Sequence, residues 1–61
     1  MENESTYKWN LFAECEAYYQ EAQEWYAVGN RERAEENEET FRALFEKIRI
    51  LGWDKEFMGI A

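Results

Sequence analysis

The sequence predicts an all-α protein, an antiparallel two-helix hairpin with a short, folded-back C-terminal turn. Apolar residues recur at spacings of three and four along two long stretches, as one face of a helix requires. Only Gly29-Asn30 lies between the stretches, and so short a connection makes the two helices antiparallel neighbours. The chain has 61 residues and no proline, so we expect one domain over residues 1–61 without a forced kink.

The first helix is expected over residues 6–28. Ser5 or Thr6 can cap its start, because a side-chain hydroxyl can accept a hydrogen bond from a free backbone N–H group. Gly29 can end the helix by adopting the left-handed backbone conformation. The residues of the inner apolar face are Leu11, Cys15, Tyr18, Ala22 and Trp25.

The second helix is expected over residues 31–51, with Asn30 as a favoured N-cap. Its inner face carries Ala34, Asn37, Phe41, Leu44, Ile48 and Leu51. Counting outward from the turn gives the expected contacts between the two faces. These pair Trp25 with Ala34, Ala22 with Asn37, Tyr18 with Phe41, Cys15 with Leu44, and Leu11 with Ile48.

The tail, residues 52–61, is expected to fold back on the hairpin. Gly52 ends the second helix, and Trp53 then falls where a Schellman ending places an apolar contact with Ile48. Asp54 resembles an N-cap, with Trp53 before it and Met58 after it at the spacing of a hydrophobic staple. A short helical turn should therefore follow.

The residues around the first turn, Ala22-x-x-Trp25-x-x-x-Gly29-x-x-x-x-Ala34, resemble the helix junction of a tetratricopeptide repeat. Beyond Ala34 the pattern departs from that family, because Glu38 stands where its second helix has an aromatic residue. The chain also holds one unit, whereas stacked repeats need several. The likeness implies a shared way of turning between helices.

Composition bounds the function. Fourteen acidic and seven basic residues give a net charge of −7, which argues against direct binding of nucleic acids or anionic membranes. Cys15 is the only cysteine and histidine is absent, so neither an internal disulfide nor an ordinary zinc site can reinforce the small core. We expect a soluble, cytoplasmic protein that a partner or a second copy supports.

An aromatic ridge flanks the inner face of the first helix. Phe12, Tyr19 and Tyr26 are seven residues apart, and Phe45 lies on the corresponding flank of the second helix. Two helices touch along one seam only, so this ridge faces water unless something covers it. We favour a second copy, which would complete a helical bundle, over two alternatives in which the tail or another protein covers the ridge.

Asn37 is a polar residue in the middle of the second apolar stripe. Burying its amide without a hydrogen-bond partner would cost about 1–3 kcal/mol. It either pairs with its symmetry mate or with the Tyr18 hydroxyl, which would fix the register of a self-associated bundle, or it lies wet at the edge of the seam.

An acidic face occupies the start of the second helix, formed by Glu32, Glu35, Glu36 and Glu39. It is either a solvated surface or a docking surface for a protein with a basic groove. A third interpretation is a Mg²⁺ site between Glu21-x-x-Glu24 and Glu35-x-x-Glu38. Because Glu21 and Glu24 turn away from the seam, we expect no metal site, and we expect no cofactor either.

The residue inventory argues against catalysis. Cys15 is expected inside the seam, where burial raises the pKa of a thiol and makes it unreactive. No histidine can activate Cys15 or Ser5, and the glycines do not form a phosphate-binding loop. Ile50 points away from the seam and, with Trp53 and Phe57, is a candidate for a further contact surface with a partner.

The sequence therefore predicts a non-enzymatic protein–protein interaction module. In the favoured hypothesis it self-associates through Phe12, Tyr19, Tyr26 and Phe45, with Asn37 setting the register. In the alternative it is an acidic inhibitor that docks through its Glu32–Glu39 face on a basic groove of a nucleic-acid-binding protein or nuclease. Its composition is similar to that of small acidic phage proteins that inhibit host defence nucleases.

Overall fold

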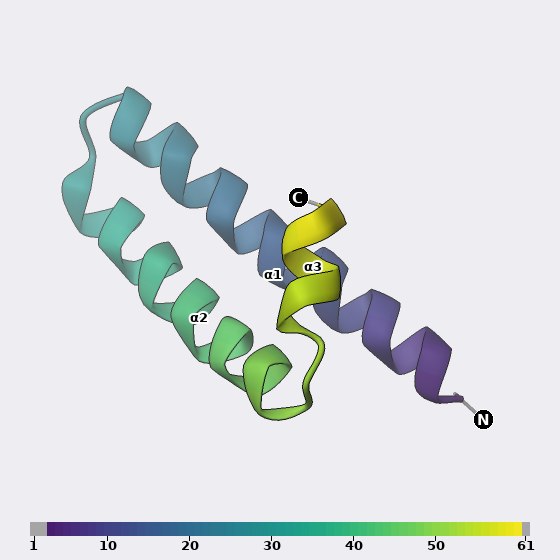
Figure 1. The fold of residues 1–61 in the computed structure, drawn as a ribbon. Coiled ribbons are helices and arrows are strands. Elements are labelled where there is room, and N and C mark those ends of the chain that lie inside the picture. Colours follow the sequence, from purple (N-terminus) through teal and green to yellow (C-terminus); the bar gives the residue numbers. More distant parts are fainter. Residues whose placement is uncertain (1–2, 61) are drawn as a thin grey trace.

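Two long antiparallel helices and one short helix make up the computed structural model, which describes residues 3–60. The helices are α1 (Glu4–Ala27), α2 (Arg31–Ile50) and α3 (Asp54–Ile60). Figure 1 shows α1 and α2 side by side as a hairpin, with α3 turning back from the end of α2 toward the middle of α1. The prediction of an all-α hairpin with a folded-back tail is confirmed.

Helix α1 begins two residues earlier than the sequence suggested. Asn3 is its N-cap, and the Asn3 Oδ1 atom accepts a hydrogen bond of 2.9 Å from the backbone N–H group of Thr6. The expectation that Ser5 or Thr6 caps the helix is therefore wrong. Asparagine ranks among the best N-cap residues, and here it lies upstream of both hydroxyl residues.

The turn between α1 and α2 is a Schellman motif. Gly29 has φ of 82°, and its N–H group donates to the carbonyl of Tyr26 at 3.1 Å. The N–H group of Asn30 donates to the carbonyl of Trp25 at 2.9 Å. Asn30 also caps α2, since its Oδ1 atom accepts a hydrogen bond from the N–H group of Arg33 at 3.1 Å. One dipeptide thus ends one helix and starts the next.

The turn after α2 repeats this design. Gly52 has φ of 80° and donates to the carbonyl of Arg49, while Trp53 donates to the carbonyl of Ile48, both at 3.0 Å. These are the two hydrogen bonds of a Schellman ending. Asp54 is the first residue of α3 rather than its N-cap, because the carbonyl of Trp53 already accepts the first helical hydrogen bond, from Phe57 at 3.0 Å.

Alanine at Gly52 is expected to destabilise the protein by about 1–2 kcal/mol, because a side chain in the left-handed region meets its own carbonyl group. Space is not the obstacle, since no atom lies within 4 Å of a Cβ placed there. Gly59 is the matched control: it also has open space but lies within α3, so alanine there should stabilise by about 0.5–1 kcal/mol. Urea unfolding followed by circular dichroism compares them. Equal effects of one sign would contradict the left-handed turn.

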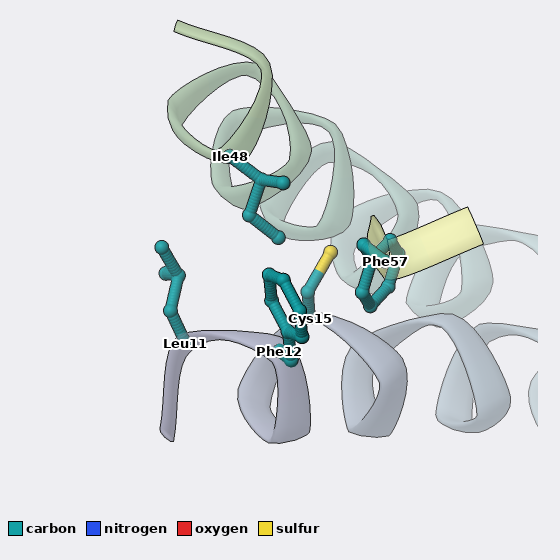
Figure 2. Close-up of a cluster of buried hydrophobic side chains, with 5 residues drawn as sticks. All are labelled: Leu11, Phe12, Cys15, Ile48 and Phe57. Carbon is teal, nitrogen blue, oxygen red and sulfur yellow. The ribbon is translucent and has the colours of Figure 1, made fainter. Parts of the chain in front are cut away.

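The core lies at the end of the hairpin that α3 covers. Figure 2 shows its buried side chains, which come from all three helices: Leu11, Phe12, Cys15, Ile48 and Phe57. Around it pack the half-buried residues Phe41, Leu44, Phe45 and Trp53. Nearer the Gly29 turn the buried residues are small, Ala22 and Ala34. The large buried side chains therefore concentrate away from that turn.

The expected pairing along the seam is shifted at Phe41. The ring that meets Phe41 belongs to Tyr19, with centroids 5.3 Å apart, where the count from the turn had placed Tyr18. The Cys15 Sγ atom lies 3.8 Å from the carbonyl oxygen of Phe41. Cys15 and Phe41 are thus at the same level of the hairpin, and the Phe41 ring faces the flank of α1.

Across residues 3–60, none of the three helices combines the length and the apolar character that crossing a membrane requires.

Candidate functional site

Phe12, expected on an exposed ridge, is buried with 4% of its surface exposed. Its ring makes edge contacts with the rings of Trp9, Trp53 and Phe57 at centroid distances of 5.5, 6.3 and 5.2 Å. The tail therefore covers this part of the ridge, which corrects the assignment of Phe12 to a self-association surface. The correction has a physical reason: Phe57 reaches back far enough to close the seam over Phe12.

Phe57, expected at a partner surface, is also a core residue, with 6% of its surface exposed. Its ring lies 5.2 Å from that of Phe12 on α1 and 6.1 Å from that of Phe45 on α2. Trp53 is half-buried against the same cluster. Phe57 is therefore largely buried within its own chain, where it holds α3 on the hairpin.

An open apolar groove remains beside α3. Its volume is about 460 Å³, and it is lined by Glu16, Tyr19, Phe41, Phe45, Phe57 and Met58. All three helices contribute to it. Two large side chains of the groove present apolar surface to solvent, since Tyr19 is 48% exposed and Met58 is 66% exposed. We call these six residues the groove.

A row of aromatic rings forms the floor of the groove. Tyr19 contacts Phe41 at 5.3 Å, Phe41 stacks on Phe45 at 6.0 Å with an interplanar angle of 27°, and Phe45 contacts Phe57 at 6.1 Å. Each ring contacts the next one along the row. Aromatic rings are common at protein interfaces, because they offer a large contact area at a low cost in side-chain entropy.

Sequence reasoning missed three groove residues, Glu16, Phe41 and Met58, and gave no role to Glu16. Phe41 was assigned to the inner seam and Met58 to a staple with Trp53. The spacing of Phe41 and Phe45, four residues apart on α2, places both rings on one side of the helix and was the available signal. No sequence signal located Met58 at the groove, because its place depends on where α3 docks.

Glu16 is the one acidic residue in the groove wall, and it is half-buried. Its Oε1 atom accepts a hydrogen bond of 3.1 Å from the side-chain amide of Gln20, one turn along α1. An acidic side chain thus lies at the rim of an otherwise apolar surface. A partner with a hydrogen-bond donor or positive charge at this point would satisfy it.

The two remaining residues of the predicted self-association set lie nearer the turn. Tyr26 is 39% exposed on α1. Asn37 is half-buried on α2, and among residues 3–60 no buried side-chain nitrogen or oxygen lacks a hydrogen-bond partner. The single chain thus fits the wet-edge alternative for Asn37, and a role in register stays a prediction.

The acidic face is exposed at all four positions, Glu32, Glu35, Glu36 and Glu39. Glu35 lies 3.8 Å from the Arg31 guanidinium in an exposed pair, which contributes little stability. Within the described chain, no three acidic or cysteine side chains converge as a metal ion would require. Ile50, the other partner candidate, is 71% exposed.

Lys8, which is not a groove residue, ties α3 to α1. Its ammonium group lies 2.8 Å from a carboxylate oxygen of Glu56. It also lies 5.7 Å from the ring centre of Trp9 and 5.8 Å from that of Trp53. Cation–π contacts of this kind add to the ion pair. They help to hold α3 where it forms one wall of the groove.

Comparison of the chain with known proteins gave no significant match to a protein-family model, to a curated protein or to a solved structure, so the groove and the acidic face stand on their geometry alone.

Proposed function

We propose that the protein is a non-enzymatic interaction module that self-associates through the groove. The observation that carries this proposal is the row of aromatic rings left open to solvent between the three helices. The groove keeps Tyr19 and Phe45 of the predicted ridge, whereas Phe12 is in the core and Tyr26 lies outside the groove. The residues that the groove adds are Glu16, Phe41, Phe57 and Met58.

The size of the exposed surface supports association. The chain exposes 4712 Å², whereas a monomer of 7.4 kDa is expected to expose about 4200 Å². Isolated cores of this size stabilise a fold by only about 3–5 kcal/mol. Covering the groove with a second copy would remove apolar surface from water and reinforce the fold at once.

Sedimentation equilibrium over a wide concentration range tests the proposal. We expect a dimer that persists at high salt, because salt does not screen aromatic contacts. Salt does screen the repulsion between two chains that each have a net charge of −7. Replacing Tyr19 with alanine should weaken the dimer at least about tenfold, equivalent to roughly 1.4 kcal/mol. Ile50→Ala, at a 71% exposed residue outside the groove, is the control and should change nothing. A monomer at every concentration would refute self-association.

A second function, docking on a basic protein, is supported by the acidic face. Four exposed carboxylates within two turns of α2 create a negative surface to which a basic groove would be attracted. Salt dependence distinguishes docking through the acidic face from self-association through the groove. Added salt should weaken docking through the acidic face, because charges are screened over about 8 Å at physiological ionic strength. Self-association through aromatic rings has no such dependence.

A further inference from the structure

Charge is unevenly divided along the hairpin. Cys15 and Phe41 lie at one level, with the Cys15 Sγ atom 3.8 Å from the Phe41 carbonyl oxygen, and they mark a natural midline. On one side is the turn half, residues 16–41, with eight acidic and two basic residues and a net charge of −6. On the other is the tail half, residues 3–15 and 42–60, with five acidic and five basic residues and no net charge.

The two halves also differ in shape. Helix α3 lies on the tail half, where Phe57 packs against Phe12 and Lys8 pairs with Glu56. The tail half is therefore raised by one helix above the hairpin. Figure 1 shows that α3 ends near the middle of α1 and leaves the half around the Gly29 turn uncovered. The groove opens at the end of α3, where Tyr19 and Phe41 of the turn half meet Met58. One half therefore protrudes, and the other is open and acidic.

We propose that the second copy docks antiparallel to the first, about a two-fold axis at the midline, so that α3 of each copy covers the open turn half of the other. This inference rests on the proposed self-association and specifies its geometry. Each raised, neutral half then faces an open, acidic half, and the contact is reciprocal, as a two-fold axis requires. A parallel arrangement would instead place the two turn halves, each with a net charge of −6, against one another, where they repel.

The exposed edge of α3 has the chemistry that this contact needs. Met58 is a flexible apolar side chain that is 66% exposed, and it can enter the aromatic groove of the second copy. Lys55 lies one turn earlier on the same side of α3. It is exposed and is the one basic residue within residues 3–60 that has no carboxylate or aromatic partner. It would bring a positive charge to the acidic half of the second copy.

Pulsed electron-spin distance measurements on the full chain test the orientation. A label is placed at Val28→Cys, near the turn, while the native Cys15, with no exposed surface, stays unlabelled. In the antiparallel dimer the two labels lie at opposite ends, with a separation comparable to the 39 Å long axis of one chain. In a parallel dimer they lie side by side, about one or two helix diameters of 10 Å apart. Mixing chains labelled at Val28 with chains labelled at Ser5→Cys should give a short distance in the antiparallel case.

A substitution pair tests the contact itself. Met58→Asp should weaken the dimer at least tenfold without changing the melting of the dilute chain, because Met58 is largely exposed. Ile50→Asp is the matched control, also at an exposed apolar residue, and should leave the dimer intact. A short distance between Val28 labels, or a dimer insensitive to Met58→Asp, would overturn the antiparallel arrangement while self-association stands. A chain that is monomeric at every concentration would overturn both.

Discussion

Phe12→Ala is expected to leave the protein largely unfolded at 25 °C. The Phe12 ring is buried and contacts rings at the start of α1, in the turn before α3 and in α3 itself. Removing a buried phenylalanine side chain costs about 3–5 kcal/mol. A domain of this size has roughly that much stability in total. Circular dichroism at 222 nm during urea titration would show the loss of the folded baseline.

Tyr26→Ala supplies the control for this experiment. Tyr26 is an aromatic residue of the same helix but is 39% exposed, and it lies outside the buried cluster. Its replacement should cost at most about 1 kcal/mol in the dilute chain. If Phe12→Ala and Tyr26→Ala had equal effects, α3 would not be packed over Phe12, and the groove wall formed by α3 would be absent as well.

Raising the pH from 9 to 11 is expected to cost the wild-type protein about 2 kcal/mol more stability than it costs Cys15→Ala. Burial raises the pKa of the Cys15 thiol from 9.0 to about 11. Between these values the unfolded chain loses the thiol proton while the folded chain keeps it. Unfolding therefore releases a proton and becomes more favourable as the pH rises, and the contribution is fully present below pH 9.

The comparison with Cys15→Ala isolates this thiol, because the tyrosine and lysine side chains titrate in both proteins. Urea unfolding at pH 8, 9, 10 and 11 gives the difference in slope. Parallel pH curves for the two proteins would contradict the raised pKa. Rapid reaction of Cys15 with a disulfide reagent in the folded protein at pH 8 would also contradict it, since the reactive species is the thiolate.

Local features of the fold were predictable from sequence because they depend on neighbouring residues. Gly29 and Gly52 end their helices as left-handed residues, and Asn30 caps α2. The hydrogen bonds of all three join residues that are close in the sequence. The error at the start of α1 was also local. Asn3 and Ser5 are both suitable caps, and the sequence contains nothing that decides between competing caps two residues apart.

The candidate site was less predictable because it depends on where seven residues of α3 dock. The periodicity of α1 places Phe12 and Tyr19 on one ridge, yet the structure buries Phe12 and exposes Tyr19. The difference arises because α3 packs over Phe12 through Phe57, whereas Tyr19 lies at the open groove beside α3. Similarly, nothing in the sequence around Phe57 distinguishes a core anchor from a partner contact, since both are apolar residues on a short amphipathic helix.

The two Schellman turns have a consequence for how the chain finds its fold. Each turn is closed by hydrogen bonds between residues no more than five positions apart. Neither turn therefore needs contacts with a distant part of the chain in order to form. Helix α1 can close on α2 from the Gly29 turn outward, and α3 then docks from a second preformed corner. Chains whose contacts can form in such a sequence of short loop closures fold in times on the order of microseconds to milliseconds. We therefore expect this chain to fold on that timescale.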